Sequence, residues 1–220
     1  MKTISIVAPC YNEEENISEL VNQIEEIFQT ELKDYRYNII FIDNDSNDKT
    51  QEIIKNHAES NKNIKLICNT RNFGHIRSPF HGLISSEGDA SILIATDLQD
   101  PPQLIVDFIE KWEEGYKIVV GSKKETEEGF LMKNMRLFYY YIMKKLTSNR
   151  HINGFTGYGL YDIEVIKELK EVKETYPYFR GLISELGYRI KKIDYSQPTR
   201  LHGKSKNNFF TLFDMAMLGI

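Results

Sequence analysis

The sequence of 220 residues contains only two cysteines, Cys10 and Cys68, and they do not form a CxxC pair. A disulfide framework and a cysteine-based metal site therefore have no support, and we expect reduced thiols in a cytoplasmic setting. Positive charge is also in deficit, because 28 Lys and Arg residues face 32 Asp and Glu residues, a formal net charge of −4 at pH 7. This balance argues against a general nucleic-acid-binding protein, so we expect no nucleic acid among the partners.

Long apolar runs and glycine-rich phosphate loops are missing as well. No apolar run reaches the roughly 20 residues that a membrane-spanning helix needs. The sequence has no GxxxxGK[ST] run, and its first apolar run leads into PCYNEEE instead of a glycine-rich turn. A P-loop enzyme and a dinucleotide-dependent dehydrogenase are thereby disfavoured. The first 14 residues turn polar after a few apolar ones, so we expect them to begin a strand and not a signal peptide.

Apolar, β-prone runs alternate with helical periodicity through the first 120 residues. These runs are ISIVA, YNIIFI, IKLIC, ASILIA and KIVVG. Between them, apolar residues recur at helical spacing, most clearly over 17–28 behind Asn16 as an N-cap and over 104–112 behind a pair of prolines. The alternation predicts an α/β fold whose mostly parallel sheet has helices on both faces. The same periodicity places Trp112 in the core.

Past residue 122 the pattern loosens. We expect an aromatic-rich helix near 130–146 and a late strand near 188–195. The stretch NGFTGYGLYD, residues 153–162, is rich in glycine and favours a turn segment that needs the backbone freedom of glycine. Whether this segment also lines a cleft for an acceptor stays open.

Three loops that follow predicted strands carry acids: PCYNEEE, DNDSNDKT and TDLQDPP. Ligands of open α/β sheets bind beyond the carboxyl ends of the strands. Acids gathered there would repel one another unless a cation lies among them, and oxygen donors favour Mg²⁺ or Mn²⁺ shared with substrate phosphates. Asp97 directly follows a buried strand and suits a metal ligand, whereas Asp100 better fits a cap for the following helix.

These motifs occur in an order that resembles a known family. The segments VAPCYNEEENI, DNDSNDKT, RNFGH, DLQDPP, VVGSK and RLHGKSK resemble those of the inverting family-two glycosyltransferases, especially the polyprenyl-phosphate sugar transferases. The resemblance implies a GT-A fold, in which a Rossmann-like, mostly parallel central sheet is flanked by helices. It further implies one domain over 1–206, with a nucleotide-sugar-binding half in 1–122 and an acceptor-side half in 123–206.

The resemblance also implies roles for individual residues. Asp97 and Gln99 would hold the metal that bridges the diphosphate, and Asp97 and Arg200 would serve catalysis. The nucleotide sugar would be bound by Pro9, Tyr11, Glu13, Asp43, Asp45, Arg71, Lys204 and Ser205. Within this set Asp43 would hydrogen-bond the nucleobase, while the guanidinium fork of Arg200 would reach phosphate oxygens.

The sequence departs from the family's pattern in two places. Ala95 stands where the family usually has the first acid of a DxD-type pair, so the metal would have one carboxylate fewer. We expect either a weaker metal affinity or a metal that binds mainly with the nucleotide. Asn44 and Asp45 stand where the family tends to have Asp and then Gly. The choice of nucleobase therefore stays open.

The sequence assigns no general base. Asp162 and Glu185 are candidates, but each lies in a helix-like segment where a surface or capping role is the alternative. A phosphate monoester needs no base because its second pKa is about 6, which is compatible with a polyprenyl phosphate acceptor. Two other functions stay open: a transferase that extends a glycan or a lipid-linked saccharide, and a nucleotide-binding relative that has lost catalysis.

The last segment, residues 207–220, is strongly apolar. It resembles the amphipathic interfacial segment that precedes membrane-spanning helices in the polyprenyl-phosphate branch, and a final helix packed on the core is the alternative. The resemblance implies a location at the cytoplasmic face of a membrane. The expected partners are a nucleotide sugar, a lipid or glycan acceptor and the membrane surface, and a homo-oligomer stays open.

Overall fold

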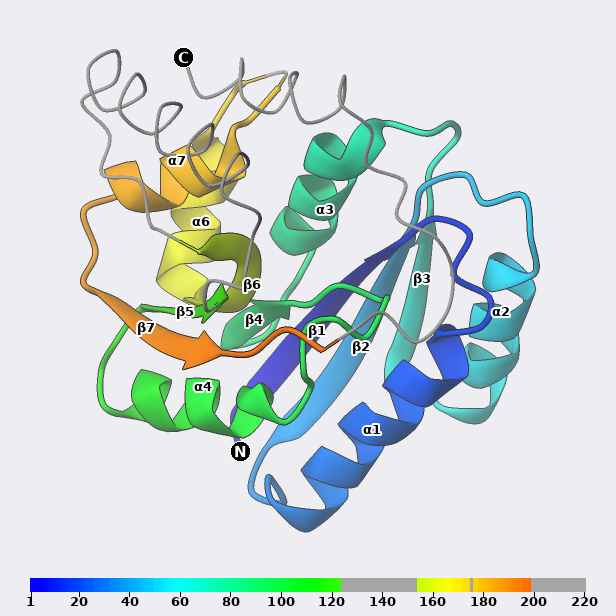
Figure 1. Cartoon of the computed structure of the whole chain (residues 1–220), viewed down its shortest axis with the longest axis horizontal. Helices are drawn as coiled ribbons and strands as arrows, with labels where there is room; N and C mark the ends of the chain where they lie inside the picture. The colour runs from blue at the N-terminus through cyan, green and yellow to red at the C-terminus, as the bar shows by residue number, and fades with distance from the viewer. Residues whose placement is uncertain (124–153, 175, 199–220) are drawn as a thin grey trace, which may run out of the picture.

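The computed structural model describes residues 1–123, 154–174 and 176–198. Its centre is a seven-stranded sheet with the strand order β3-β2-β1-β4-β6-β5-β7 (Figure 1). The strands are β1 (Thr3–Cys10), β2 (Arg36–Asp43), β3 (Ile64–Cys68), β4 (Ala90–Leu93), β5 (Ile118–Lys123), β6 (Phe155–Asp162) and β7 (Ile190–Tyr195). The helices are α1 (Ile17–Thr30), α2 (Thr50–Ser60), α3 (Gly74–Ile84), α4 (Leu104–Glu113), α6 (Ile163–Glu171) and α7 (Phe179–Glu185).

The sheet is mostly parallel, as the alternating pattern predicts. Strand β1 pairs in parallel with β2 and with β4, and β2 pairs in parallel with β3. Strand β6 is the exception, because it runs antiparallel to both β4 and β5. Strands from both predicted halves, 1–122 and 123–206, belong to this one sheet.

The prediction of a turn over 153–162 is wrong, because Phe155–Asp162 forms the central strand β6. Its glycines allow a close approach of the neighbouring strand. A Cβ atom on Gly159 would lie 2.5 Å from the carbonyl oxygen of Val119 in β5. Position 159 therefore has to be glycine because of its contact with β5. The local sequence does not reveal that contact.

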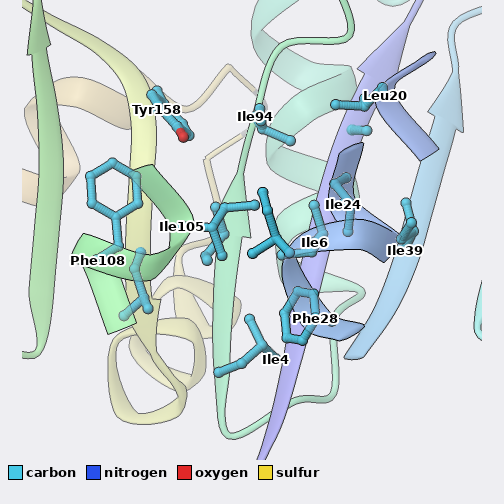
Figure 2. Packing of buried hydrophobic residues seen from close by; sticks show 14 of the residues in the cluster. Ile4, Ile6, Leu20, Ile24, Phe28, Ile39, Ile94, Ile105, Phe108 and Tyr158 are labelled. Atoms are coloured by element: carbon cyan, nitrogen blue, oxygen red, sulfur yellow. The ribbon is translucent and has the colours of Figure 1, made fainter. Parts of the chain in front are cut away.

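Helices cover both faces of the sheet (Figure 1). Helices α1, α2 and α4 contribute to one apolar core, and α3, α6 and α7 contribute to the other. Figure 2 shows Ile4 and Ile6 of β1 beside Ile24 and Phe28 of α1 in the first core. Each such buried side chain stabilises the fold by about 1.5–3 kcal/mol. Trp112 is also buried there, as predicted.

Two local predictions need comment. Asn16 occupies the N-cap position of α1 but makes no side-chain capping bond. Its amide nitrogen donates to Oε2 of Glu13 at 2.7 Å instead. The predicted aromatic helix near 130–146 and the apolar segment 207–220 lie outside the described residues. Of the helices that the structure describes, none combines the length and apolar composition needed to cross a membrane.

Candidate functional site

The loops that carry the predicted site residues leave one edge of the sheet. Strands β2, β1 and β4 are parallel neighbours, so their carboxyl ends lie together. The loops after β1 and β2 are bonded to each other. The backbone N–H of Asn12 donates to Oγ of Ser46 at 2.8 Å, and that of Glu13 donates to the hydroxyl of Thr50 at 2.9 Å. These contacts give the two loops a defined relative position.

Asp43, at the end of β2, is fully buried and already bonded on both oxygens. Its Oδ2 accepts from the side-chain amide of Gln51 at 2.7 Å and from the backbone N–H of Ser46 at 3.0 Å. Its Oδ1 accepts from the hydroxyl of Ser46 and from the thiol of Cys10. Asp43 therefore organises the loop after β2, and a nucleobase would bond to it only by displacing one of these donors.

Protein donors also satisfy Asp48 in the same loop. Its carboxylate accepts from the backbone N–H groups of Thr50 at 3.0 Å and Glu14 at 3.3 Å. Burial raises the pKa of Asp48, but the hydrogen bonds from Thr50 and Glu14 outweigh it and leave this pKa below its usual value. Among the described residues, no three His, Cys, Asp or Glu side chains are grouped to hold a metal. The carboxylates of Asp43 and Asp48 in the loop after β2 are therefore held by protein donors.

A pocket of about 320 Å³ opens at the carboxyl ends of β1 and β4, against α3, β6 and α7. Its polar lining consists of His75, Asp97, Gln99, Asp100, Thr156, Arg180 and Gln197. Its remaining lining is largely apolar and includes Pro9, Ile76, Pro79, Phe80, Leu83, Leu93, Ile94, Ala95, Tyr178 and Phe179. A concave site with a mostly apolar wall and a few polar groups is typical of a small-molecule site.

The loop after β4 presents two oxygen donors to this pocket. Leu98 has a positive φ of 59° and is buried in the core. A left-handed conformation at such a residue costs about 1–2 kcal/mol, and here it leaves Asp97 and Gln99 to line the pocket. The Asp97 carboxylate and the Gln99 amide oxygen are hard donors that fit Mg²⁺ or Mn²⁺. Two protein ligands would leave most coordination positions to substrate and water.

Asp100 does not cap α4, so that prediction is wrong. The N-cap residue of α4 is Gln103, and no side chain caps this helix. Asp100 is instead buried, and it accepts from the hydroxyl of Tyr195 at 2.7 Å and from the backbone N–H of Ala95 at 3.2 Å. Burial raises the pKa of Asp100 to about 6, although these two hydrogen bonds act to lower it.

Neither candidate base belongs to the pocket. Asp162 accepts from the backbone N–H of Glu164 at 2.9 Å and thereby caps α6, which confirms the alternative role. It also accepts from the indole of Trp112 at 2.7 Å. Because Asp162 pairs with Ala90, the first residue of β4, it lies at the opposite end of the sheet from the pocket. Glu185 is exposed at the end of α7 and does not line the pocket.

The structure gathers part of the predicted set. Pro9, Asp97 and Gln99 line the pocket together. Tyr11, Glu13, Asp43, Asp45 and Arg71 lie in or beside the loops that follow β1, β2 and β3 but do not line it. Arg200, Lys204 and Ser205 lie outside the described residues. The sequence analysis assigned no role to His75, Phe179 and Arg180, which line the pocket from α3 and α7. His75 closes the RNFGH motif, whereas Phe179 and Arg180 belong to no motif that the sequence showed.

Comparisons with known proteins agree with this architecture. The profile of glycosyl transferase family 2 matches residues 5–169. The chain is 33% identical over 217 residues to the uncharacterized glycosyltransferase YkcC of Bacillus subtilis. This alignment covers 98% of this chain and 67% of that protein. It is 34% identical over 218 residues to the bactoprenol glucosyl transferase of Shigella phage SfV, covering 99% of this chain and 70% of the relative.

A solved structure has the same fold. The glucosyl-3-phosphoglycerate synthase of Mycobacterium tuberculosis, in complex with Mn²⁺, UDP and phosphoglyceric acid, matches with a TM-score of 0.64 at 18% identity. The match covers 98% of this chain and 75% of that chain. It confirms the predicted GT-A arrangement of a mostly parallel sheet between helices.

Proposed function

We propose the following reaction because the chain belongs to glycosyl transferase family 2 and is a glycosyltransferase. The enzyme transfers a sugar from a nucleoside diphosphate sugar to a polyprenyl phosphate, with inversion at the anomeric carbon. A relative named bactoprenol glucosyl transferase, 34% identical over 99% of this chain, supports a lipid phosphate as the acceptor. The observation that carries the proposal is the pocket at the end of β4, which combines Asp97 and Gln99 with a largely apolar wall.

The acids of the pocket favour a phosphate acceptor over a sugar hydroxyl. Among the described residues, Asp97 and Asp100 are the acids that line the pocket. Asp97 is assigned to the metal, and Asp100 is buried against Tyr195 and Ala95. A sugar hydroxyl would need a general base, whereas a phosphate monoester is already largely ionised near neutral pH. Neither pocket acid is thus assigned as the base that glycan extension would need.

In the reaction, an oxygen of the acceptor phosphate attacks the anomeric carbon from the face opposite the diphosphate. The bond between this carbon and the diphosphate oxygen breaks, and its electron pair leaves with the nucleoside diphosphate. A divalent ion, when bound, neutralises the charge that develops on this leaving group. The chain's own residues hold the reactants: Asp97 and Gln99 carry the oxygen donors for that ion, and Arg200 supplies a fixed positive charge to the phosphates.

The remaining predicted residues are assigned to the nucleotide. This set consists of Pro9, Tyr11, Glu13, Asp43, Asp45, Arg71, Lys204 and Ser205. Pro9 lines the pocket together with the loop that carries Asp97 and Gln99. Arg71 lies in the loop after β3, where its guanidinium stands 4.3 Å from the centre of the Phe73 ring. Asp43 acts on the nucleotide through the loop that it organises.

Transfer of a labelled sugar tests the proposal. The purified chain is incubated with UDP-, GDP- or dTDP-sugars, Mn²⁺ and a detergent-dispersed polyprenyl phosphate. We expect a lipid product from one donor, its loss with chelator, and a rate at least a hundredfold lower for Asp97→Ala, since one metal ligand is gone. Asp34→Asn is the matched control, because Asp34 is an exposed acid that precedes β2 at the other end of the sheet.

The outcomes separate the alternatives. Transfer only to a sugar hydroxyl would overturn the lipid acceptor and favour glycan extension. Nucleotide binding without transfer to either acceptor would favour a relative that has lost catalysis, with Ala95 as its cause.

We also infer that the chain works at the cytoplasmic face of a membrane, because its acceptor is a lipid. Co-flotation with vesicles that contain polyprenyl phosphate, but not with plain vesicles, is the expected result.

A further inference from the structure

The loop that carries Asp97 and Gln99 is held in place by hydrogen bonds to three different strands. The hydroxyl of Thr96 donates to the carbonyl oxygen of Pro9 in β1 at 2.8 Å. The hydroxyl of Tyr158 in β6 donates to the carbonyl oxygen of Pro101 at 2.6 Å. The hydroxyl of Tyr195 in β7 donates to Oδ1 of Asp100 at 2.7 Å. The loop is thus fixed at its start and at its end.

The bond from Tyr195 is unusual because it bridges strands that are not neighbours. Two strands, β6 and β5, separate β4 from β7 in the sheet. The ring of Tyr195 packs edge-on against that of Tyr158, with centroids 5.9 Å apart. Both rings lie over Gly121 of β5, where a Cβ atom would be 3.0 Å from the Tyr158 ring and 3.1 Å from the Tyr195 ring. The lack of a side chain at this glycine leaves room for the bridge.

Asp100 transmits this contact to the loop backbone. Its Oδ2 accepts from the backbone N–H of Ala95, five residues earlier, while Oδ1 accepts from Tyr195. A buried carboxylate is expensive to desolvate, and its two oxygens require donors in fixed directions. An apolar side chain would fill the same space without fixing the loop. Asp100 therefore holds the segment between Ala95 and Asp100 in one conformation.

We propose that Asp100 and Tyr195 are a pair of positioning residues for the sugar transfer, holding Asp97 and Gln99 toward the pocket. The inference rests on the proposed function. The pair also connects the loop that carries Asp97 and Gln99 to the segment that follows β7, where Gln197 lines the same pocket. The loop after β4 and Gln197, which are far apart in the sequence, thereby meet at one pocket.

The test compares Tyr195→Phe and Asp100→Asn with Tyr35→Phe. Tyr35 is a matched control, because its hydroxyl also donates to a carboxylate, Glu113 at 2.9 Å, but in an exposed hydrogen bond away from the pocket. The affinity for Mn²⁺ is measured by calorimetry in the presence of UDP or GDP, whichever the unaltered chain binds. The kcat, the KM for the acceptor and the Tm are measured in parallel.

For Tyr195→Phe and Asp100→Asn we expect the Kd for Mn²⁺ to rise and kcat to fall roughly tenfold, the effect typical of lost outer-shell partners of a metal site. The KM for the acceptor should stay within about twofold, and Tyr35→Phe should change neither Kd nor kcat. A lower Tm for Tyr195→Phe with unchanged Mn²⁺ affinity and kcat would show a merely structural role and overturn the proposal. If the unaltered chain neither binds a nucleotide with Mn²⁺ nor transfers sugar, the proposed function itself fails, and the role of the pair fails with it.

Discussion

A substitution at Gly159 tests whether residues 155–162 form a central strand or a turn. A Cβ atom on Gly159 would lie 2.5 Å from the carbonyl oxygen of Val119 and 3.0 Å from Cα of Val120. Both atoms belong to the backbone of β5, so relief requires β5 and β6 to move apart. Overpacking of this kind costs about 1–3 kcal/mol or more. A Gly→Ala change without strain would instead stabilise by about 0.4–1 kcal/mol.

We therefore expect Gly159→Ala to lower the free energy of unfolding by about 2 kcal/mol, measured by urea denaturation. The corresponding fall in Tm is about 4–8 °C for a domain of this size. Gly187→Ala is the control, because its Cβ would meet no atom within 4 Å and only the positive φ of 77° opposes it. A neutral or stabilising effect of Gly159→Ala would refute the pairing of β5 with β6 and restore the turn.

Two further predictions concern polar contacts outside the pocket. The pKa of Asp48 is lowered in the folded state, so its stabilising effect is present at neutral pH and is lost as the pH falls through that pKa. Asp48→Ala should thus lower the free energy of unfolding by about 1 kcal/mol at pH 7. The difference in this free energy between the variant and the unaltered chain should shrink below about pH 4. A difference that does not vary with pH would contradict this assignment. Trp112→Phe removes the 2.7 Å bond to Asp162 while keeping an aromatic ring, and should cost about 1–3 kcal/mol in urea denaturation; no loss would mean that Asp162 is satisfied without the indole.

Much of the fold follows from periodicity along the chain. The first helix was predicted because its apolar residues recur at helical spacing, and every predicted apolar position of α1 is buried. The five early strands were predicted because each is a short run of apolar, β-prone residues. Strand β6 was missed because Gly157 and Gly159 also signal a turn. The approach of β5 decides between a strand and a turn for this segment. That contact joins residues about 40 positions apart.

The site was predictable to a similar degree. Asp97 was found because a carboxylate directly after a buried run must lie at the carboxyl edge of the sheet. The role of Asp100 was not, because its decisive partner Tyr195 comes 95 residues later. His75, Phe179 and Arg180 reach the pocket through the packing of α3 and α7. Local pattern therefore locates residues at strand ends, while tertiary packing determines their hydrogen bonds.

The most direct test of the central claim is a calorimetric titration of UDP-, GDP- and dTDP-sugars with Mn²⁺ or with chelator, for the unaltered chain and for Asp97→Ala. The claim is that Asp97 anchors the metal-bound donor in the pocket at the end of β4. We predict that one nucleotide sugar binds, and that chelator and the substitution each weaken this binding at least tenfold. Equal binding with chelator and with Asp97→Ala would contradict the claim.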